Sequence, residues 1–125
     1  MSGIAGIIHP TLTTEQREGA VLRMCGAMSH RGLGEVALFS SGEVTIGWRR
    51  RAGERQPLQT PDGRYTLVFD GALYNAGELR RELESHWVFQ GDDPAEALLA
   101  AYARWGESCL DRLRGMFAFA IWDGI

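Results

Sequence analysis

Ser2 is the residue of this sequence whose type and position most directly suggest chemistry, because it follows the initiator methionine. Removal of Met1 would leave a free α-amine and a hydroxyl on one residue. An N-terminal serine, threonine or cysteine can attack a carbonyl with its side chain while its own amine accepts the proton. The alternative interpretation is a processed start that leads into a buried strand, and the first seven residues alone favour that alternative.

The elements that must position Ser2 are predicted from local patterns. An apolar run over 3–8 that stops before Pro10 predicts a buried strand. Thr13 and Gln16 have the spacing of a capping box and predict a helix over 14–28. Further strands are predicted over 35–40 and 43–47 (a hairpin), 64–70, 86–89 and 116–122. Further helices are predicted over 77–85 with Asn75 as the cap, over 94–105 with Asp93 as the cap, and over 108–113.

Hairpins bring strands together in an antiparallel arrangement, so these elements predict an α+β layered domain. Asp123-Gly124 is typical of a hairpin turn, after which a returning strand is expected. We therefore expect residues 1–125 to form one domain, truncated at the C-terminus, of a longer protein. The apolar strand over 117–122 would then have a free edge that favours self-association.

Composition narrows the classes of function. A net charge of -3 spread along 125 residues argues against nucleic acid as the partner, and no apolar run is long enough to predict a membrane partner. Cys25 and Cys109 lack the spacing of metal ligands and are predicted to be buried thiols in a reducing compartment. We expect a cytoplasmic protein without a metal site in this region. The arginine-rich segment that begins at Arg49 is typical of a solvated loop, with an anion-binding patch as the alternative.

Seven segments together resemble one known family: Gly3-Ile-Ala-Gly-Ile7, Met28-Ser-His-Arg-Gly32, Gly47-Trp-Arg-Arg50, Phe69-Asp-Gly-Ala-Leu-Tyr-Asn75, Glu78-Leu-Arg-Arg-Glu-Leu83, Ala103-Arg-Trp-Gly106 and Leu113-Arg-Gly-Met-Phe-Ala-Phe-Ala-Ile-Trp-Asp123. The chain resembles the class II glutamine amidotransferase domain of the asparagine-synthetase type. The resemblance implies an αββα N-terminal-nucleophile-hydrolase fold, with two antiparallel sheets between helical layers. It also implies a following synthetase domain that binds ATP and Mg²⁺, whereas no cofactor is expected within residues 1–125.

The family's catalytic residues are altered in this sequence. Ser2 occupies the position of the family's nucleophilic cysteine, and an alkoxide is harder to generate than a thiolate. The family's Asn-Gly-Glu motif reads Asp70-Gly71-Ala72. The family's asparagine donates a hydrogen bond to the developing oxyanion, which an ionised Asp70 would repel. Ala72 has lost the carboxylate that contacts the ammonium group of the substrate.

The family's substrate contacts are altered as well. A Ser-Asp pair of the family aligns with Asp93-Pro94, so the carboxylate at the second position is replaced by proline. Asp92 or Asp93 would substitute for it only if the loop shifted. Arg50 remains where the family grips the substrate carboxylate. L-glutamine is therefore expected to bind weakly or not at all.

Three hypotheses follow from this pattern. The first is a domain without glutaminase activity that supports a synthetase domain, as the resemblance implies for β-lactam synthetases and lasso-peptide cyclases. The second is a working glutaminase domain of an asparagine synthetase in which Ser2 replaces the cysteine. The third is an independent interaction domain that uses the strand edge over 117–122. The first accounts for the joint loss of the nucleophile, the oxyanion donor and the substrate carboxylates.

Overall fold

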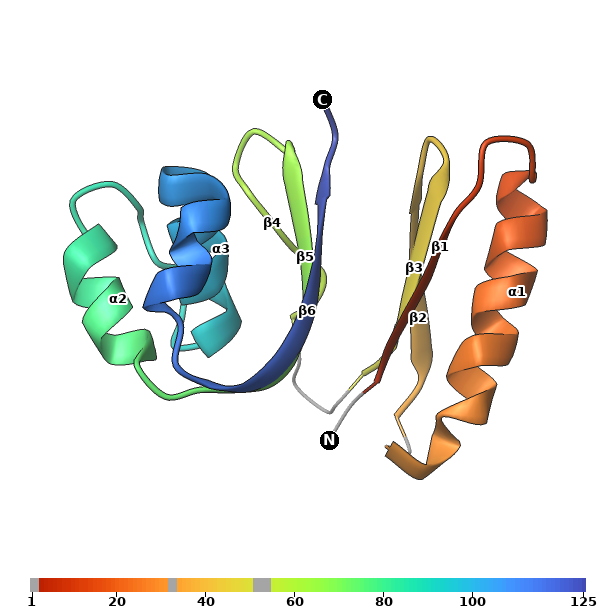
Figure 1. Ribbon diagram of the computed structural model, residues 1–125, viewed down its shortest axis with the longest axis horizontal. Helices are drawn as coiled ribbons and strands as arrows, with labels where there is room; N and C mark the ends of the chain where they lie inside the picture. Colours follow the sequence, from red (N-terminus) through yellow and green to blue (C-terminus); the bar gives the residue numbers. More distant parts are fainter. Residues whose placement is uncertain (1–2, 32–33, 51–54) are drawn as a thin grey trace. The chain divides into compact units, whose positions relative to one another are not determined.

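A computed structural model describes residues 3–31, 34–50 and 55–125. The chain divides into two compact units, Met1–Gln56 and Pro57–Ile125. Each unit contains one three-stranded antiparallel sheet with helices on one face (Figure 1). The predicted α+β class with antiparallel strands is confirmed.

The first unit contains strand β1 (Ile4–Ile8), helix α1 (Thr14–Ala27), a 3₁₀ turn (Ser29–Arg31), and strands β2 (Val36–Ser41) and β3 (Val44–Arg49). The sheet order is β1-β3-β2, with β3 in the centre. Thr13 caps α1 through the predicted capping box, in which its side chain accepts from the backbone of Gln16 at 3.1 Å. The predicted hairpin forms between β2 and β3, and Gly42 supplies the positive φ of its turn.

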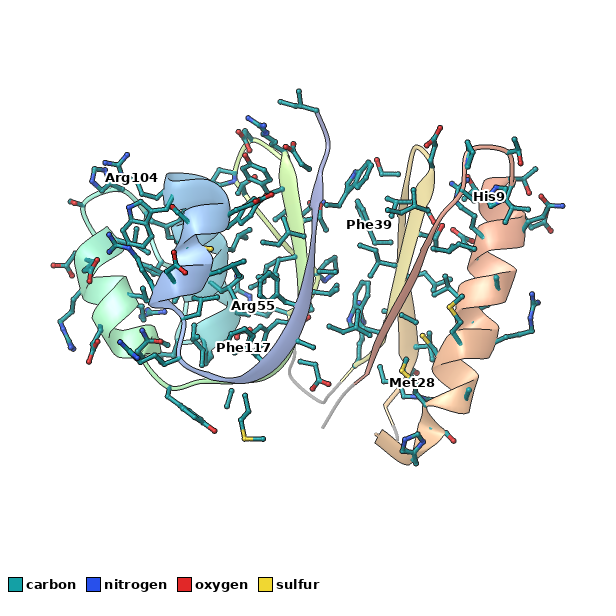
Figure 2. All side chains as sticks on the ribbon, viewed as in Figure 1. His9, Met28, Phe39, Arg55, Arg104 and Phe117 are labelled. Atoms are coloured by element: carbon teal, nitrogen blue, oxygen red, sulfur yellow. The ribbon has the colours of Figure 1, made fainter. Side chains whose placement is uncertain are left out.

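Helix α1 packs very closely on the sheet at Gly47. A Cβ atom added there would lie 2.5 Å from Val21 Cγ1 and 2.9 Å from Cys25 Sγ. The buried Arg17 guanidinium anchors the start of the helix by donating to the Leu12 and Gly42 carbonyl oxygens at 2.8 and 2.7 Å. Because side chains alternate along a strand, the residues next to Gly47 face away from α1. Figure 2 shows Phe39 of β2 on that opposite face.

The second unit contains strands β4 (Leu58–Gln59), β5 (Tyr65–Leu73) and β6 (Gly115–Asp123), helices α2 (Ala76–Leu83) and α3 (Pro94–Trp105), and a 3₁₀ helix (Gly106–Arg112). The sheet order is β4-β5-β6. Asp93 caps α3 and Pro94 occupies its first turn, as predicted. The core forms between the two helices and one face of the sheet, where Leu67 and Phe69 of β5 belong to one buried cluster with residues of α2 and α3. Figure 2 shows Phe117 of β6 on the same side of the sheet.

The predicted strand over 86–89 is wrong. Within the described part of the chain these residues have no strand partner, and their aromatic side chains, Trp87 and Phe89, pack against the core instead. The buried Glu96 carboxylate holds this segment by accepting hydrogen bonds from Trp87 Nε1 at 3.0 Å and from the Gln90 backbone at 2.9 Å. The alternating apolar residues therefore indicate burial of two side chains here rather than strand pairing. No helix in the described part of the chain is long and apolar enough to cross a membrane.

Candidate functional site

Arg50 lies directly after β3, at the end of the sheet where β1 begins. The backbone N–H of Arg49 donates to the Gly3 carbonyl at 3.1 Å, so the first described residue of the chain lies beside this end of β3. The backbone N–H of Arg50 donates to the Glu35 carbonyl at 2.8 Å and fixes its main chain. Arg50 itself is exposed. Arg50 is thus exposed at the end of β3, and its predicted contact with a substrate carboxylate stays a prediction.

Arg49 has a structural role that the sequence pattern did not separate from that of Arg50. Its Nε donates to the Cys25 carbonyl at 3.1 Å, and its Nη1 donates to the Gly34 carbonyl at 3.0 Å. These contacts join the end of α1 to the segment that precedes β2. Gly34 also approaches the carbonyl oxygen of Arg50 so closely that an added Cβ would lie 1.5 Å away. Two neighbouring arginines of one motif therefore differ: Arg49 is hydrogen-bonded within the first unit, whereas Arg50 is exposed.

Asp70, Gly71 and Ala72 all lie within β5. The strand was predicted to end at Asp70, but it continues through Gly71 and Ala72 to Leu73 because β6 pairs with it along its whole length. Asp70 and Ala72 lie on the face away from the helices, because Phe69 and Leu73 are in the helix-side core. Asp70 is 9 % exposed, whereas Ala72 is exposed.

Gly71 is required by the approach of the two strands. Its φ is +131°, a region that residues with a side chain rarely adopt. A Cβ atom added there would lie 2.1 Å from the Met116 carbonyl oxygen and 2.6 Å from Phe117 Cα. The glycine of the Asp-Gly-Ala segment therefore has a packing reason to be present, whatever the chemistry of the site.

Asn75 has a role that differs from its predicted one. It stands at the start of α2, yet its side chain makes no capping hydrogen bond. Its Nδ2 instead donates to the Arg112 carbonyl at 2.6 Å, and its Oδ1 accepts from the Arg114 backbone at 3.1 Å. The side chain thus joins the end of β5 to the loop before β6. The capping prediction failed because the partner lies 37 residues away in the sequence.

Asp92 and Asp93 are both engaged within the second unit. The Asp93 carboxylate accepts from the Ala95 backbone at 3.0 Å, as expected of a helix cap. The Asp92 carboxylate is fully exposed and lies 3.9 Å from Arg80 Nη2. One carboxylate thus serves the helix end and the other is in solvent, and their predicted contact with the ammonium group of a substrate stays a prediction.

Ser2 lies outside the described residues, so its predicted place as the nucleophile stays a prediction. The two cysteines are poor alternatives. Both are unpaired and fully buried, and burial raises the pKa of each thiol, with Arg49 partly opposing that rise at Cys25. A thiol with a raised pKa holds little of the reactive thiolate at neutral pH. Among the described residues no cluster of three or more His, Cys, Asp or Glu side chains could hold a metal ion.

The sequence model of the glutamine amidotransferase domain matches residues 1–125. The chain belongs to this family. The chain is 37% identical to asparagine synthetase [glutamine-hydrolyzing] 1 of Bacillus subtilis over 98% of its own length and 21% of that protein. It is 43% identical to a putative asparagine synthetase [glutamine-hydrolyzing] of Mycobacterium tuberculosis over 85% of its own length and 19% of that protein. The amidotransferase domain is therefore of the asparagine-synthetase type, and it spans about a fifth of the length of these relatives.

A solved structure supports the fold. The glutamine phosphoribosylpyrophosphate (PRPP) amidotransferase of B. subtilis, complexed with ADP and GMP, aligns with a TM-score of 0.56 and 28% sequence identity. The alignment covers 67% of this chain and 22% of that chain. With the two antiparallel sheets and their helices, this likeness confirms the predicted N-terminal-nucleophile-hydrolase-like fold.

Proposed function

We propose that this amidotransferase domain does not hydrolyse glutamine and serves as the structural partner of an ATP-dependent, amide-forming synthetase domain. The parent enzyme would resemble a β-lactam synthetase or a lasso-peptide cyclase, which needs no ammonia. ATP and Mg²⁺ belong to the synthetase domain in this proposal, and residues 1–125 hold no cofactor. The two unbridged thiols suit a reducing, cytoplasmic location.

The observation that carries the proposal is the Asp70-Gly71-Ala72 segment of β5. A carboxylate that is ionised only accepts hydrogen bonds, so Asp70 in that form gives no donor to an oxyanion. Ala72 has no polar atom beyond its backbone. Gly71 matches the family, but the 2.1 Å approach of Met116 explains the glycine without catalysis. This segment therefore keeps the glycine that the sheet requires, whereas the hydrogen-bond donor and the carboxylate that glutamine hydrolysis requires are replaced.

The remaining contacts support the same conclusion. Asp93, the nearest carboxylate to the family's lost aspartate, caps α3 through the Ala95 backbone. Moving that carboxylate to a substrate would cost the helix its cap, about 1 kcal/mol. Arg50 stays available as a carboxylate ligand. One such contact without its ammonium partners gives weak affinity for an amino acid.

Restoring the nucleophile alone tests the proposal. We expect Ser2→Cys to release no ammonia from L-glutamine, because the loss of one oxyanion donor by itself costs about 100-fold to 1,000-fold in rate. Mass spectrometry must first show that Met1 is absent, and thermal unfolding must show a folded chain. The matched variant is Ser2→Cys with Asp70→Asn and Ala72→Glu, which returns the donor and one substrate carboxylate. Ammonia release by the single variant at rates near those of the triple variant would overturn the proposal.

A working glutaminase is the second candidate. It is favoured by the relatives, whose names describe glutamine-hydrolysing asparagine synthetases and which match up to 98% of this chain. This candidate predicts clear binding of L-glutamine to the chain as it stands, measured by calorimetry, because binding does not require the nucleophile. It also predicts that Arg50→Ala abolishes that binding. Absence of binding by a folded chain would exclude this candidate.

A further inference from the structure

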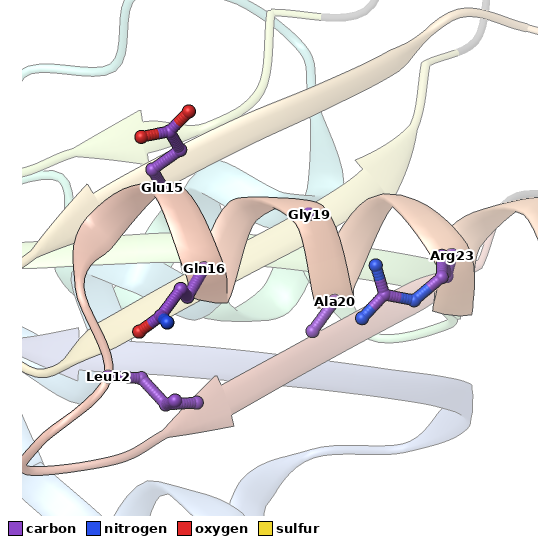
Figure 3. Close-up of a pocket in the computed structure, with 6 residues that line it drawn as sticks. All are labelled: Leu12, Glu15, Gln16, Gly19, Ala20 and Arg23. Carbon is purple, nitrogen blue, oxygen red and sulfur yellow. The ribbon is translucent and has the colours of Figure 1, made fainter.

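Helix α1 carries a groove on the side away from the sheet. Its buried side, with Arg17, Val21 and Cys25, packs on the strands, so the groove is not needed for the fold of the first unit. The groove has a volume of about 480 Å³ and is open to solvent (Figure 3). Its lining residues are Leu12, Glu15, Gln16, Gly19, Ala20 and Arg23.

The groove runs between two parallel rows of the helix surface. One row is Glu15, Gly19 and Arg23, each four residues from the next, and Gln16 and Ala20 form the row beside it. Rows of this spacing are the ridges that pack into the grooves of a second helix at a crossing angle of about 50°. The middle of the groove has almost no side chain, because its residues there are glycine and alanine. A second helix can therefore approach closely.

The charges of the groove are complementary to themselves. Glu15 lies four residues before Gly19 and Arg23 lies four residues after it. Neither side chain has an ion pair or hydrogen bond with another residue in the described ranges. An antiparallel copy of α1 crossing at Gly19 would place each Glu15 beside the Arg23 of the other copy. A two-fold axis through the crossing makes both pairs at once, as an isologous interface requires.

We propose that this groove is the contact surface of a symmetric dimer, and that its occupant is helix α1 of a second copy of this chain. Gly19 lies on the two-fold axis and faces itself. A Cβ added to Gly19 would meet only Arg23 Nη1, at 3.7 Å, so the surface around it is open. The helix is about 21 Å long at 1.5 Å per residue over 14 residues, so the interface is small and the dimer dissociates on dilution. Salt weakens it further, because its ion pairs are exposed.

Charge exchange in the 125-residue chain tests the proposal, with sedimentation equilibrium over a range of concentrations as the measurement. Glu15→Lys converts both pairs to like-charge contacts, and we expect the association constant to fall about tenfold. Arg23→Glu has the same effect. The double variant Glu15→Lys with Arg23→Glu restores the pairing with exchanged partners, so we expect association within about twofold of the original. A residue with only an internal structural role would not show this rescue.

Gly19→Glu is an independent test, because it places two carboxylates against each other on the axis. We expect it to abolish association. The matched variant is Gly77→Glu on helix α2 of the second unit, where an added Cβ likewise meets only an arginine Nη1 four residues further on, at 3.9 Å, and we expect it to leave association unchanged. Circular dichroism checks that each variant is folded. A folded chain that is monomeric at every concentration would overturn the proposal. Association that ignores all of these variants would also overturn it, and would assign self-association to another surface, such as the free edge of β6.

Discussion

Alanine in place of Gly71 separates a packing reason for this glycine from a catalytic one. The residue lies in the Asp-Gly-Ala segment of β5, where its φ of +131° is accompanied by a 2.1 Å approach of the Met116 carbonyl oxygen to an added Cβ. Two other glycines of the chain provide controls. Gly63 has a φ of +74° with no atom near an added Cβ, and Gly26 has neither constraint.

The expected change in the free energy of unfolding differs among the three positions. Gly26→Ala stabilises the helix by about 0.5–1 kcal/mol, because glycine loses more backbone entropy on folding than alanine. Gly63→Ala costs about 1 kcal/mol through the unfavourable φ alone. Gly71→Ala adds a backbone clash to a similar strain. About 1–3 kcal/mol for the strain and about 1–3 kcal/mol for the overpacking give about 4 kcal/mol. For a chain of this size such a loss lowers Tm by roughly 15 °C.

Urea unfolding of the three variants, followed by circular dichroism, measures these differences. The expected order of stability is Gly26→Ala, the unmodified chain, Gly63→Ala and then Gly71→Ala. If Gly71→Ala costs no more than Gly63→Ala, the strand approach does not require the glycine. The retention of Gly71 would then need a functional reason, and the packing explanation of this glycine would be wrong.

Two further predictions concern the second unit. Glu96→Ala leaves the Trp87 indole and the Gln90 backbone N–H without their acceptor. We expect the free energy of unfolding in urea to fall by about 3 kcal/mol and the tryptophan fluorescence to change. Glu96→Gln keeps one acceptor, so its loss of stability should be smaller. The second prediction concerns pH. The hydrogen bond from Arg64 holds the pKa of Asp123 below its usual range, so the Arg64–Asp123 pair stabilises the fold above about pH 4. This stability is lost as the pH falls through the lowered pKa of Asp123. Asp123→Asn should flatten the acid limb of a plot of Tm against pH, and an unchanged limb would contradict the assignment.

Local signals predicted most of the elements. The Thr13 capping box and the Asp93-Pro94 pair each predict the start of a helix from residues at most three positions apart, and the structure confirms both starts. The hairpin of β2 and β3 follows from a two-residue turn between strand-like runs. The family could also be recognised from the sequence, because its motifs are contiguous segments. These features depend on neighbours in the chain, which is why the sequence reveals them.

Only the tertiary structure shows where β5 ends, which groups the Asn75 side chain binds, and why the strand approach requires glycine at position 71. Each depends on β6 or the loop before it, which lie about 40 residues further along the chain. The segment 86–89 looked like a strand because burial and pairing favour the same apolar residues, and only the absence of a partner strand among the described residues distinguishes the two. The sequence thus determined the family, and its resemblance to that family predicted which catalytic residues are replaced. Hydrogen-bond partners distant in sequence determined which of the remaining residues are kept for the fold.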